Sequence, residues 1–214
     1  MKKSNIDAVI FDLDGVVTNS TPLHSLAWKT MFDQFLKNQA GKTATPFREF
    51  THEEDYLAYV DGKPRYTGVK SFLESRGFNL PFGDPSQEPG QESICALGNL
   101  KDQLFNQMLT EQGVEIYPST IELIHTLKDS GIPLGLATSS KNAARVLDIT
   151  GLSDLFQTRV DGIVSAELGL EGKPSPDIFH KACDQLGAAY DRSVIIEDAN
   201  SGVEAGYRGH FGWY

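Results

Sequence analysis

The chain of 214 residues contains only two cysteines, Cys95 and Cys183, which lie far apart in the sequence. They lack the close spacing of a metal site, and a small disulfide-stabilised fold would need more of them. We therefore expect both to be reduced core residues of a cytoplasmic protein.

Positive charge and long apolar runs are also scarce. The chain has 19 Lys and Arg residues against 29 Asp and Glu residues, a formal net charge of −10. Nucleic acid and anionic membranes both require a basic face, so we expect neither as a partner. No run approaches the roughly 18–20 apolar residues of a membrane helix. The first apolar run meets Asp12 too early for a signal peptide. We expect a soluble, monomeric globular protein.

Short runs of branched apolar residues alternate with helical patterns along much of the chain. Such runs are typical of fully buried strands in a parallel sheet. They are Ile6–Asp12, Ile132–Thr138, Val160–Ser165 and Ser193–Asp198. Helical patterns between them end at glycines such as Gly151 and Gly187. The alternation predicts an α/β fold with a doubly wound, Rossmann-like parallel sheet.

One interval departs from this alternation. Between the first strand and Tyr117 lie about a hundred residues with helical patterns and no strand signal. Apolar residues and a histidine recur there on one helix face, at His24, Trp28, Met31, Phe32 and Phe35. Thr51 and Glu54 form a capping box ahead of another helix. We expect a core domain of residues 1–19 and 117–214, with an α-helical domain of residues 20–116 inserted after the first strand.

Polar side chains follow the expected strands. The set comprises Asp12 and Asp14 after the first strand, Thr138, Ser139 and Ser140 after the second, Glu197 and Asp198 after the fourth, and Lys173 in "EGKPSPD". In open α/β sheets the ligand crevice lies beyond the carboxyl ends of the strands. These residues are therefore expected to meet at one edge of the sheet.

The carboxylates at this edge require a positive partner. Asp12 and Asp14 face the same side of the extended chain, and like charges disfavour each other's ionised form. A hard divalent cation with oxygen ligands, Mg²⁺, relieves the repulsion if Asp12, Asp14, Glu197 and Asp198 hold it. A carboxylate beside Mg²⁺ and Lys173 stays ionised and can attack phosphorus, which gives an aspartyl-phosphate. The hydroxyl cluster then helps to position the phosphoryl oxygens.

Each motif also has a simpler interpretation when taken alone. "DLDG" can be a solvated turn, although Val16 stands where a calcium loop needs Asp or Asn. Thr138, Ser139 and Ser140 can cap the next helix. Lys173 can be a surface lysine, and the acid pair can belong to a loop. Their joint placement at successive strand ends favours phosphoryl transfer.

In these motifs the chain resembles the haloacid dehalogenase superfamily. "FDLDG", the hydroxyl motif, "GKPSPDIF" and "IIEDANSG" occur in the family's order. The resemblance implies that Asp12 is the nucleophile and Asp14 the general acid/base, with Thr138 and Lys173 also catalytic. It implies that Mg²⁺ is held by the Asp12 carboxylate, the Asp14 backbone carbonyl and Asp198, with Glu197 in support. The helical insertion would be a mobile cap.

Within that superfamily, "FDLDGVVTNSTPLHSLAWK" resembles the opening of the β-phosphoglucomutase family. This resemblance implies a second phosphate site, with His24 in the linker to the cap and Arg65 of "GKPR" on the cap side. The core side would be Ser139, Ser140, Lys141 and Asn142. A guanidinium fork and a helix N-terminus both suit phosphate. Two phosphate sites would suit a sugar bisphosphate that turns over between half-reactions.

The chain departs from that family at several positions. Asn19 stands where the mutases have Asp, and Gln107 falls near a cap lysine for which Lys101 is a possible substitute. The cap holds additional sequence around "KPRYTGVKSFLESRGFNLPFGD". The resemblance also implies a further strand and helix after "GYRGHFGWY", so we expect a core domain that is either truncated at its C-terminal end or lacks an edge of the sheet.

Three functions are compatible with these residues. The first is Mg²⁺-dependent phosphoryl transfer on a small sugar phosphate, as in a mutase. The second is a phosphatase of small phosphorylated metabolites, in which water accepts the phosphoryl group from Asp12. The third is a phospho-acceptor signalling module, which Asp14 and the helical insertion disfavour because such a module should keep its aspartyl-phosphate. We expect the first.

Overall fold

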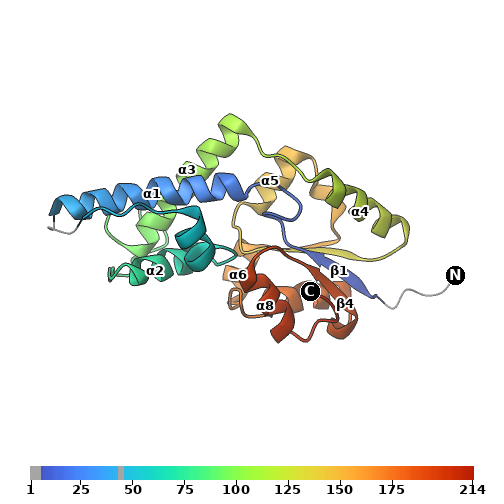
Figure 1. The fold of residues 1–214 in the computed structure, drawn as a ribbon. Coiled ribbons are helices and arrows are strands. Elements are labelled where there is room, and N and C mark those ends of the chain that lie inside the picture. The colour runs from blue at the N-terminus through green and yellow to red at the C-terminus, as the bar shows by residue number, and fades with distance from the viewer. Residues whose placement is uncertain (1–5, 43–45) are drawn as a thin grey trace. The chain divides into compact units, whose positions relative to one another are not determined.

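The structure is a computed structural model that describes residues 6–42 and 46–214. The chain separates into two compact units. The core unit comprises the chain up to Ser20, Gly62–Pro64 and Val114–Tyr214, and the helical unit comprises Thr21–Asp61 and Arg65–Gly113. Figure 1 labels the elements of both units.

The core unit is built on a four-stranded parallel sheet with the strand order β3-β2-β1-β4. Its strands are β1 (Ala8–Phe11), β2 (Leu134–Ala137), β3 (Thr158–Val160) and β4 (Ser193–Ile196). Its α-helices are α4 (Pro118–Asp129), α5 (Ala143–Thr150), α6 (Gly162–Leu168), α7 (Asp177–Leu186) and α8 (Asn200–Arg208), and its 3₁₀ turns are η2 (Ser153–Leu155) and η3 (Tyr190–Arg192).

Helices cover both faces of this sheet. Ile10 of β1 packs with Phe179 of α7 and Ala205 of α8 in one buried cluster. Helix α4, with its buried Ile124, lies against β2 from the opposite face (Figure 1). The prediction of a doubly wound parallel α/β sheet is confirmed. Because the strand order reverses at β1, the carboxyl ends of β1 and β4 form the switch point at which such sheets bind ligands.

The strand predicted at Val160–Ser165 is wrong in its position. The strand is β3, Thr158–Val160, and helix α6 begins directly after it at Gly162. Asp161 ends the strand because its side chain accepts hydrogen bonds from the backbone N–H groups of Ile163 and Val164, at 2.9 and 3.0 Å. An N-cap of this kind favours helix over the β-propensity of the apolar residues that follow.

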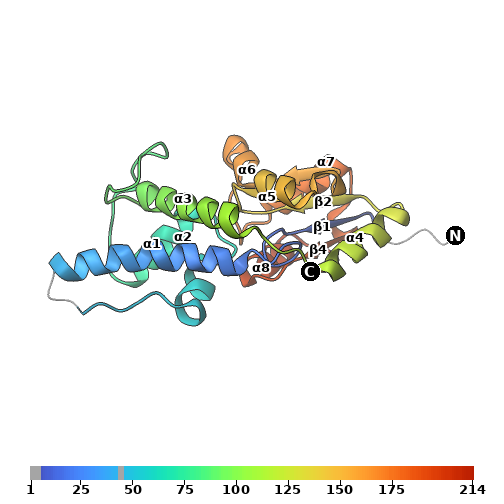
Figure 2. The ribbon, with the colours of Figure 1, turned by 90° about the horizontal axis from the view of Figure 1, so that it is seen from above.

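The helical unit contains α1 (Thr21–Lys42), the π-helix η1 (His52–Val60), α2 (Arg65–Ser75) and α3 (Ile94–Gln112). Figure 2 shows α1 and α3 running along each other, and the two helices are in contact. The helix face predicted from His24 to Phe35 is buried throughout. Its aromatic side chains join Phe50 and Phe72 in the core of this unit.

The predicted capping box differs in one detail. The Thr51 side chain accepts a hydrogen bond from the Glu54 backbone N–H at 3.3 Å, as expected. The reciprocal acceptor for the Thr51 backbone N–H is the carboxylate of Asp55, at 2.9 Å, rather than that of Glu54. The element that follows is a π-helix, so its side-chain phase is not that of an α-helix.

Both cysteines are buried, and neither forms a disulfide bond in the part of the chain that the structure describes. No helix among the described residues combines the length and the apolar content needed to cross a membrane.

Candidate active site

Asp12 lies at the switch point, one residue after β1. Its backbone N–H donates to the carbonyl of Ile196 at 2.9 Å, which places Asp12 beside the end of β4. The side chain is 5% exposed. The ammonium of Lys173 donates to Asp12 Oδ1 at 2.6 Å and to Glu197 Oε2 at 2.8 Å. Three residues from distant parts of the sequence thus form one buried charged cluster.

The electrostatics of this cluster are unbalanced. Burial lowers the pKa of a lysine, but the carboxylates of Asp12 and Glu197 outweigh it and raise the pKa of Lys173. Burial raises the pKa of Asp12, Lys173 opposes this, and the charge of Asp14 adds to it. Burial, and then the charge of Asp12, raise the pKa of Glu197 to about 8. A single ammonium therefore leaves surplus negative charge in a buried place.

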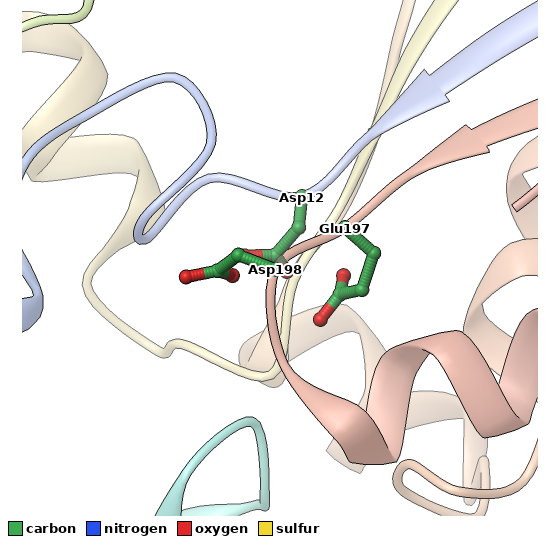
Figure 3. Close-up of side chains that lie close together, drawn as sticks. All are labelled: Asp12, Glu197 and Asp198. Atoms are coloured by element: carbon green, nitrogen blue, oxygen red, sulfur yellow. The ribbon is translucent and has the colours of Figure 1, made fainter.

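A cation would fit beside these carboxylates. Asp12, Glu197 and Asp198 each offer an oxygen, and these oxygens lie within 4.8 Å of one another (Figure 3). Carboxylate oxygens at this spacing suit a hard divalent ion such as Mg²⁺. Among the described residues, the carboxylates that could share a metal ion do not include that of Asp14. Metal binding by the backbone carbonyl of Asp14 stays a prediction.

Two glycines make room for the acidic side chains. Gly15 has a φ of +87°, and a Cβ atom there would lie 1.9 Å from Asp198 Oδ2. A Cβ at Gly202 of α8 would lie 2.1 Å from the carboxyl carbon of Glu197. Figure 3 shows Asp12 directly after β1, and Glu197 and Asp198 directly after β4. Gly15 and Gly202 are therefore part of the site, and Gly202 was not predicted from the sequence.

Asp14 is held by hydroxyl groups. The Ser20 hydroxyl donates to Asp14 Oδ1 at 2.5 Å, and the Thr18 hydroxyl lies 3.0 Å from that of Ser20. Thr18 and Ser20 are both fully buried. Ser20 was not among the residues predicted for the site. The available signal was a hydroxyl residue six positions after Asp14, immediately before a helix.

The predicted hydroxyl motif lies at the end of β2. Thr138 is 2% exposed, and its Oγ1 accepts from the Ser140 backbone N–H at 3.1 Å. The Ser139 hydroxyl donates to the Gly62 carbonyl at 2.9 Å, within the core unit. Ser140 Oγ accepts from the Asn142 backbone N–H at 3.2 Å, and α5 begins at Ala143. The motif shapes the turn into α5, while phosphate binding by Ser139, Ser140, Lys141 and Asn142 stays a prediction.

The remaining predicted residues lie in the helical unit. His24 is buried, and its Nδ1 lies 2.6 Å from the ammonium of Lys101, which is itself 5% exposed. Arg65 begins α2 and forms an ion pair with Asp102 at 2.6 Å. Gln107 donates to Glu111 at 2.9 Å on the exposed face of α3. The structure thus places Lys101, rather than Gln107, next to His24. The joint role of Arg65 with the turn before α5 stays a prediction.

A buried aspartate in contact with a lysine, beside two further carboxylates at the switch point of a parallel sheet, is the arrangement of a phosphoryl-transfer enzyme. The family model described as "haloacid dehalogenase-like hydrolase" matches residues 6–209. The chain belongs to the haloacid dehalogenase-like hydrolase family. It is an enzyme, and its similarity within that family is to phosphomutases and phosphatases.

The chain is similar to several named members of this family. The chain is 39% identical over 206 residues to a protein from Mycobacterium bovis named beta-phosphoglucomutase, covering 96% of this chain and 79% of that protein. It is 30% identical over 198 residues to the beta-phosphoglucomutase of Bacillus subtilis, covering 92% and 77%. The crystal structure of beta-phosphoglucomutase from Clostridium difficile has a TM-score of 0.74, with 24% identity, and the match covers 97% of this chain and 83% of that one. This structural match shows a shared fold.

Proposed function

We propose that this enzyme transfers a phosphoryl group through an aspartyl-phosphate on Asp12 and acts on a small sugar phosphate, as a β-phosphoglucomutase. The contact between the buried Asp12 and Lys173 carries this proposal, because the ammonium keeps the carboxylate ionised while burial removes competing water. The two curated relatives support the sugar phosphate as substrate. The cytoplasmic location and the monomeric state expected from the sequence stay predictions.

In the first half-reaction, an oxygen of the Asp12 carboxylate forms a bond to phosphorus as the bond to the sugar oxygen breaks. The departing oxygen needs a proton, and Asp14 supplies it as general acid. The hydroxyl of Ser20 holds the Asp14 carboxylate in place through the 2.5 Å hydrogen bond. Lys173 offsets the charge on the transferring group, and Glu197 fixes Lys173 from its other side.

In the second half-reaction, the phosphoryl group leaves Asp12 and a proton returns to Asp14. Asp14, now ionised, accepts the proton of the attacking hydroxyl, and that oxygen bonds to phosphorus as the bond to Asp12 breaks. A sugar hydroxyl as acceptor completes a mutase cycle, whereas water gives a phosphatase. Exclusion of water by the helical unit, in its predicted role as cap, would favour the sugar.

The acidic cluster is proposed to hold Mg²⁺ through Asp12 and Asp198, with the Asp14 carbonyl and Glu197 in support. When bound, the ion supplies positive charge that neutralises the phosphoryl oxygens and the surplus carboxylates. The oxygen spacing within 4.8 Å and the raised pKa values of Asp12 and Glu197 support this assignment.

The decisive experiment is a coupled assay for glucose 6-phosphate, with β-glucose 1-phosphate as substrate and with or without a glucose bisphosphate primer. We expect primer-dependent formation of glucose 6-phosphate in the presence of Mg²⁺. Release of inorganic phosphate without glucose 6-phosphate would replace the mutase with the phosphatase.

Two variants test the assignments of the aspartates. Asp12→Asn should abolish turnover and phosphoryl labelling, and Asp14→Asn should slow turnover by about 10²–10⁴-fold while labelling by an activated phosphodonor continues. Asp154→Asn is the control, because Asp154 is exposed. Normal turnover in Asp14→Asn would contradict the acid/base assignment.

A further inference from the structure

The N-terminal end of α2 is held against α3 by a short polar contact. Arg65 is the first residue of α2, and its Nη2 donates to Oδ1 of Asp102 in α3 at 2.6 Å. Both side chains are shielded from solvent, with exposures of 14% for Arg65 and 28% for Asp102. The guanidinium is therefore fixed along one edge before any substrate binds.

A glycine allows this close approach. A Cβ atom at Gly98 of α3 would lie 2.7 Å from Cδ1 of Tyr66 and 3.3 Å from Cδ of Arg65. The side chains of Arg65 and Tyr66 thus pack directly over the α3 backbone. Asp102 lies four residues after Gly98, one turn further along the same helix. Gly98 lets the aliphatic part of the Arg65 side chain pack against α3, and Asp102 holds the guanidinium.

Tyr66, the residue after Arg65, is also hydrogen-bonded to α3. The Tyr66 hydroxyl donates to Asn99 Oδ1 at 2.9 Å. The Asn99 amide donates to the carbonyls of Pro85 and Gln87 at 3.0 and 2.8 Å. Pro85 and Gln87 lie in the loop between α2 and α3. This loop is tied to the residue next to Arg65.

We propose that Asp102 is a positioning residue for Arg65, which fixes one edge of the guanidinium so that its other N–H groups are preset to bind a phosphate of the substrate. The inference rests on the proposed function and on the second phosphate site that the family resemblance implies for Arg65. A guanidinium has five N–H donors, so the contacts of Arg65 with Asp102 and Tyr66 leave donors for a phosphate. A preset fork loses less rotamer freedom on binding than a free one.

The first test is Asp102→Asn, which keeps the shape of the side chain and removes its charge. The KM for β-glucose 1-phosphate should rise about tenfold, with kcat changed by less than about twofold, because the weakened contact affects binding. Hydrolysis of p-nitrophenyl phosphate, which has a single phosphate, should be unchanged. A merely structural role would move both substrates together and would overturn the proposal. So would an unchanged or lowered KM, which would mean that Asp102 competes with the phosphate.

Two further variants guard against a folding defect. Asp102→Glu keeps the charge and should restore at least part of the lost KM effect. Glu74→Gln is the matched control, since Glu74 forms an exposed pair with Lys70 at 3.8 Å in the same unit. Each variant should melt within a few degrees of the unaltered protein. If Asp102→Glu behaves like Asp102→Asn while both melt normally, the charge of Asp102 is not what positions Arg65.

A double-mutant cycle separates this inference from the function on which it rests. Arg65→Lys loses the fork, and adding Asp102→Asn to it should raise the KM by less than about twofold more, because the two residues act as one unit. If Arg65→Lys alone leaves the KM unchanged, the distal phosphate role of Arg65 fails. If Arg65→Lys raises the KM and Asp102→Asn does not, only the inference about Asp102 fails.

Discussion

Lys173 shows how much of the site depends on a single side chain. Its ammonium contacts both Asp12 and Glu197, and the side chains of all three residues are buried. The Asp12 carboxylate also accepts a backbone hydrogen bond from Asp14, but Lys173 supplies the positive charge that opposes both acids. Removal of the ammonium therefore leaves two carboxylates in a low-dielectric place.

Lys173→Met should lower the free energy of unfolding by about 3–5 kcal/mol in the absence of divalent ions, because it leaves buried carboxylates unpaired. Urea denaturation followed by circular dichroism measures this. Mg²⁺ should recover part of the loss. Lys70→Met, at an exposed pair, should change stability by less than about 1 kcal/mol. Equal effects of the two variants would contradict the buried-cluster interpretation.

Gly202→Ala sets helix propensity against packing. Alanine within a helix is favoured over glycine by roughly 0.5–1 kcal/mol. At Gly202, however, the new methyl would meet the Glu197 carboxyl carbon at 2.1 Å. Displacement of Glu197 also displaces Lys173, so kcat should fall about a hundredfold. The control is Gly41→Ala in α1, where no atom lies within 4 Å of the added Cβ. Its kcat should not change.

At the level of elements, the boundary between β3 and α6 depends on Asp161. Its carboxylate, 1% exposed, accepts two N-terminal N–H groups of α6 and also pairs with Arg159 at 2.9 Å. Asp161→Ala should lower the free energy of unfolding by about 1–2 kcal/mol, as expected for loss of an N-cap. The urea midpoint measures it. Asp154→Ala, at an exposed position of the same region, should stay within about 0.5 kcal/mol of the parent.

The same boundary explains what could and could not be predicted at this scale. Strands β1, β2 and β4 were predictable because each is a short apolar run that ends abruptly in polar residues. The third strand was misplaced because "VDGIVS" has β-branched residues on both sides of Asp161. Only the cap geometry decides between strand and helix there. The supports of Asp14 and Glu197, namely Ser20 and Gly202, were missed because sequence spacing alone does not show which residue a turn brings against each carboxylate.

For the whole molecule, the acidic cluster predicts a response to metal. A ligand that binds only the folded state adds about 2.7 kcal/mol of stability at a hundredfold excess over its Kd. Mg²⁺ should therefore raise the melting temperature, and Asp198→Asn should reduce that rise. NaCl of matched ionic strength controls for screening of the net charge of −10. An equal rise with NaCl would contradict specific binding by Asp12, Glu197 and Asp198.

The family and the fold were accessible from the sequence as a whole, because four motifs stand in a fixed order along an alternating α/β pattern. The contact that holds Arg65 was not accessible in the same way, because its partner Asp102 lies 37 positions further along the chain. Sequence spacing carries no information about such a pairing.

The central place of β1 in the sheet has a consequence for biosynthesis. Ala8–Phe11 is translated before both of its neighbours, β2 and β4, which begin at Leu134 and Ser193. Ribosomes add about 5–20 residues per second, so this apolar tetrapeptide emerges many seconds before any strand exists to pair with it. The helical unit ends at Gly113, before β2 begins, so it can fold during that delay. Chaperones that bind nascent chains should accordingly engage the N-terminal strand until β2 and β4 have emerged.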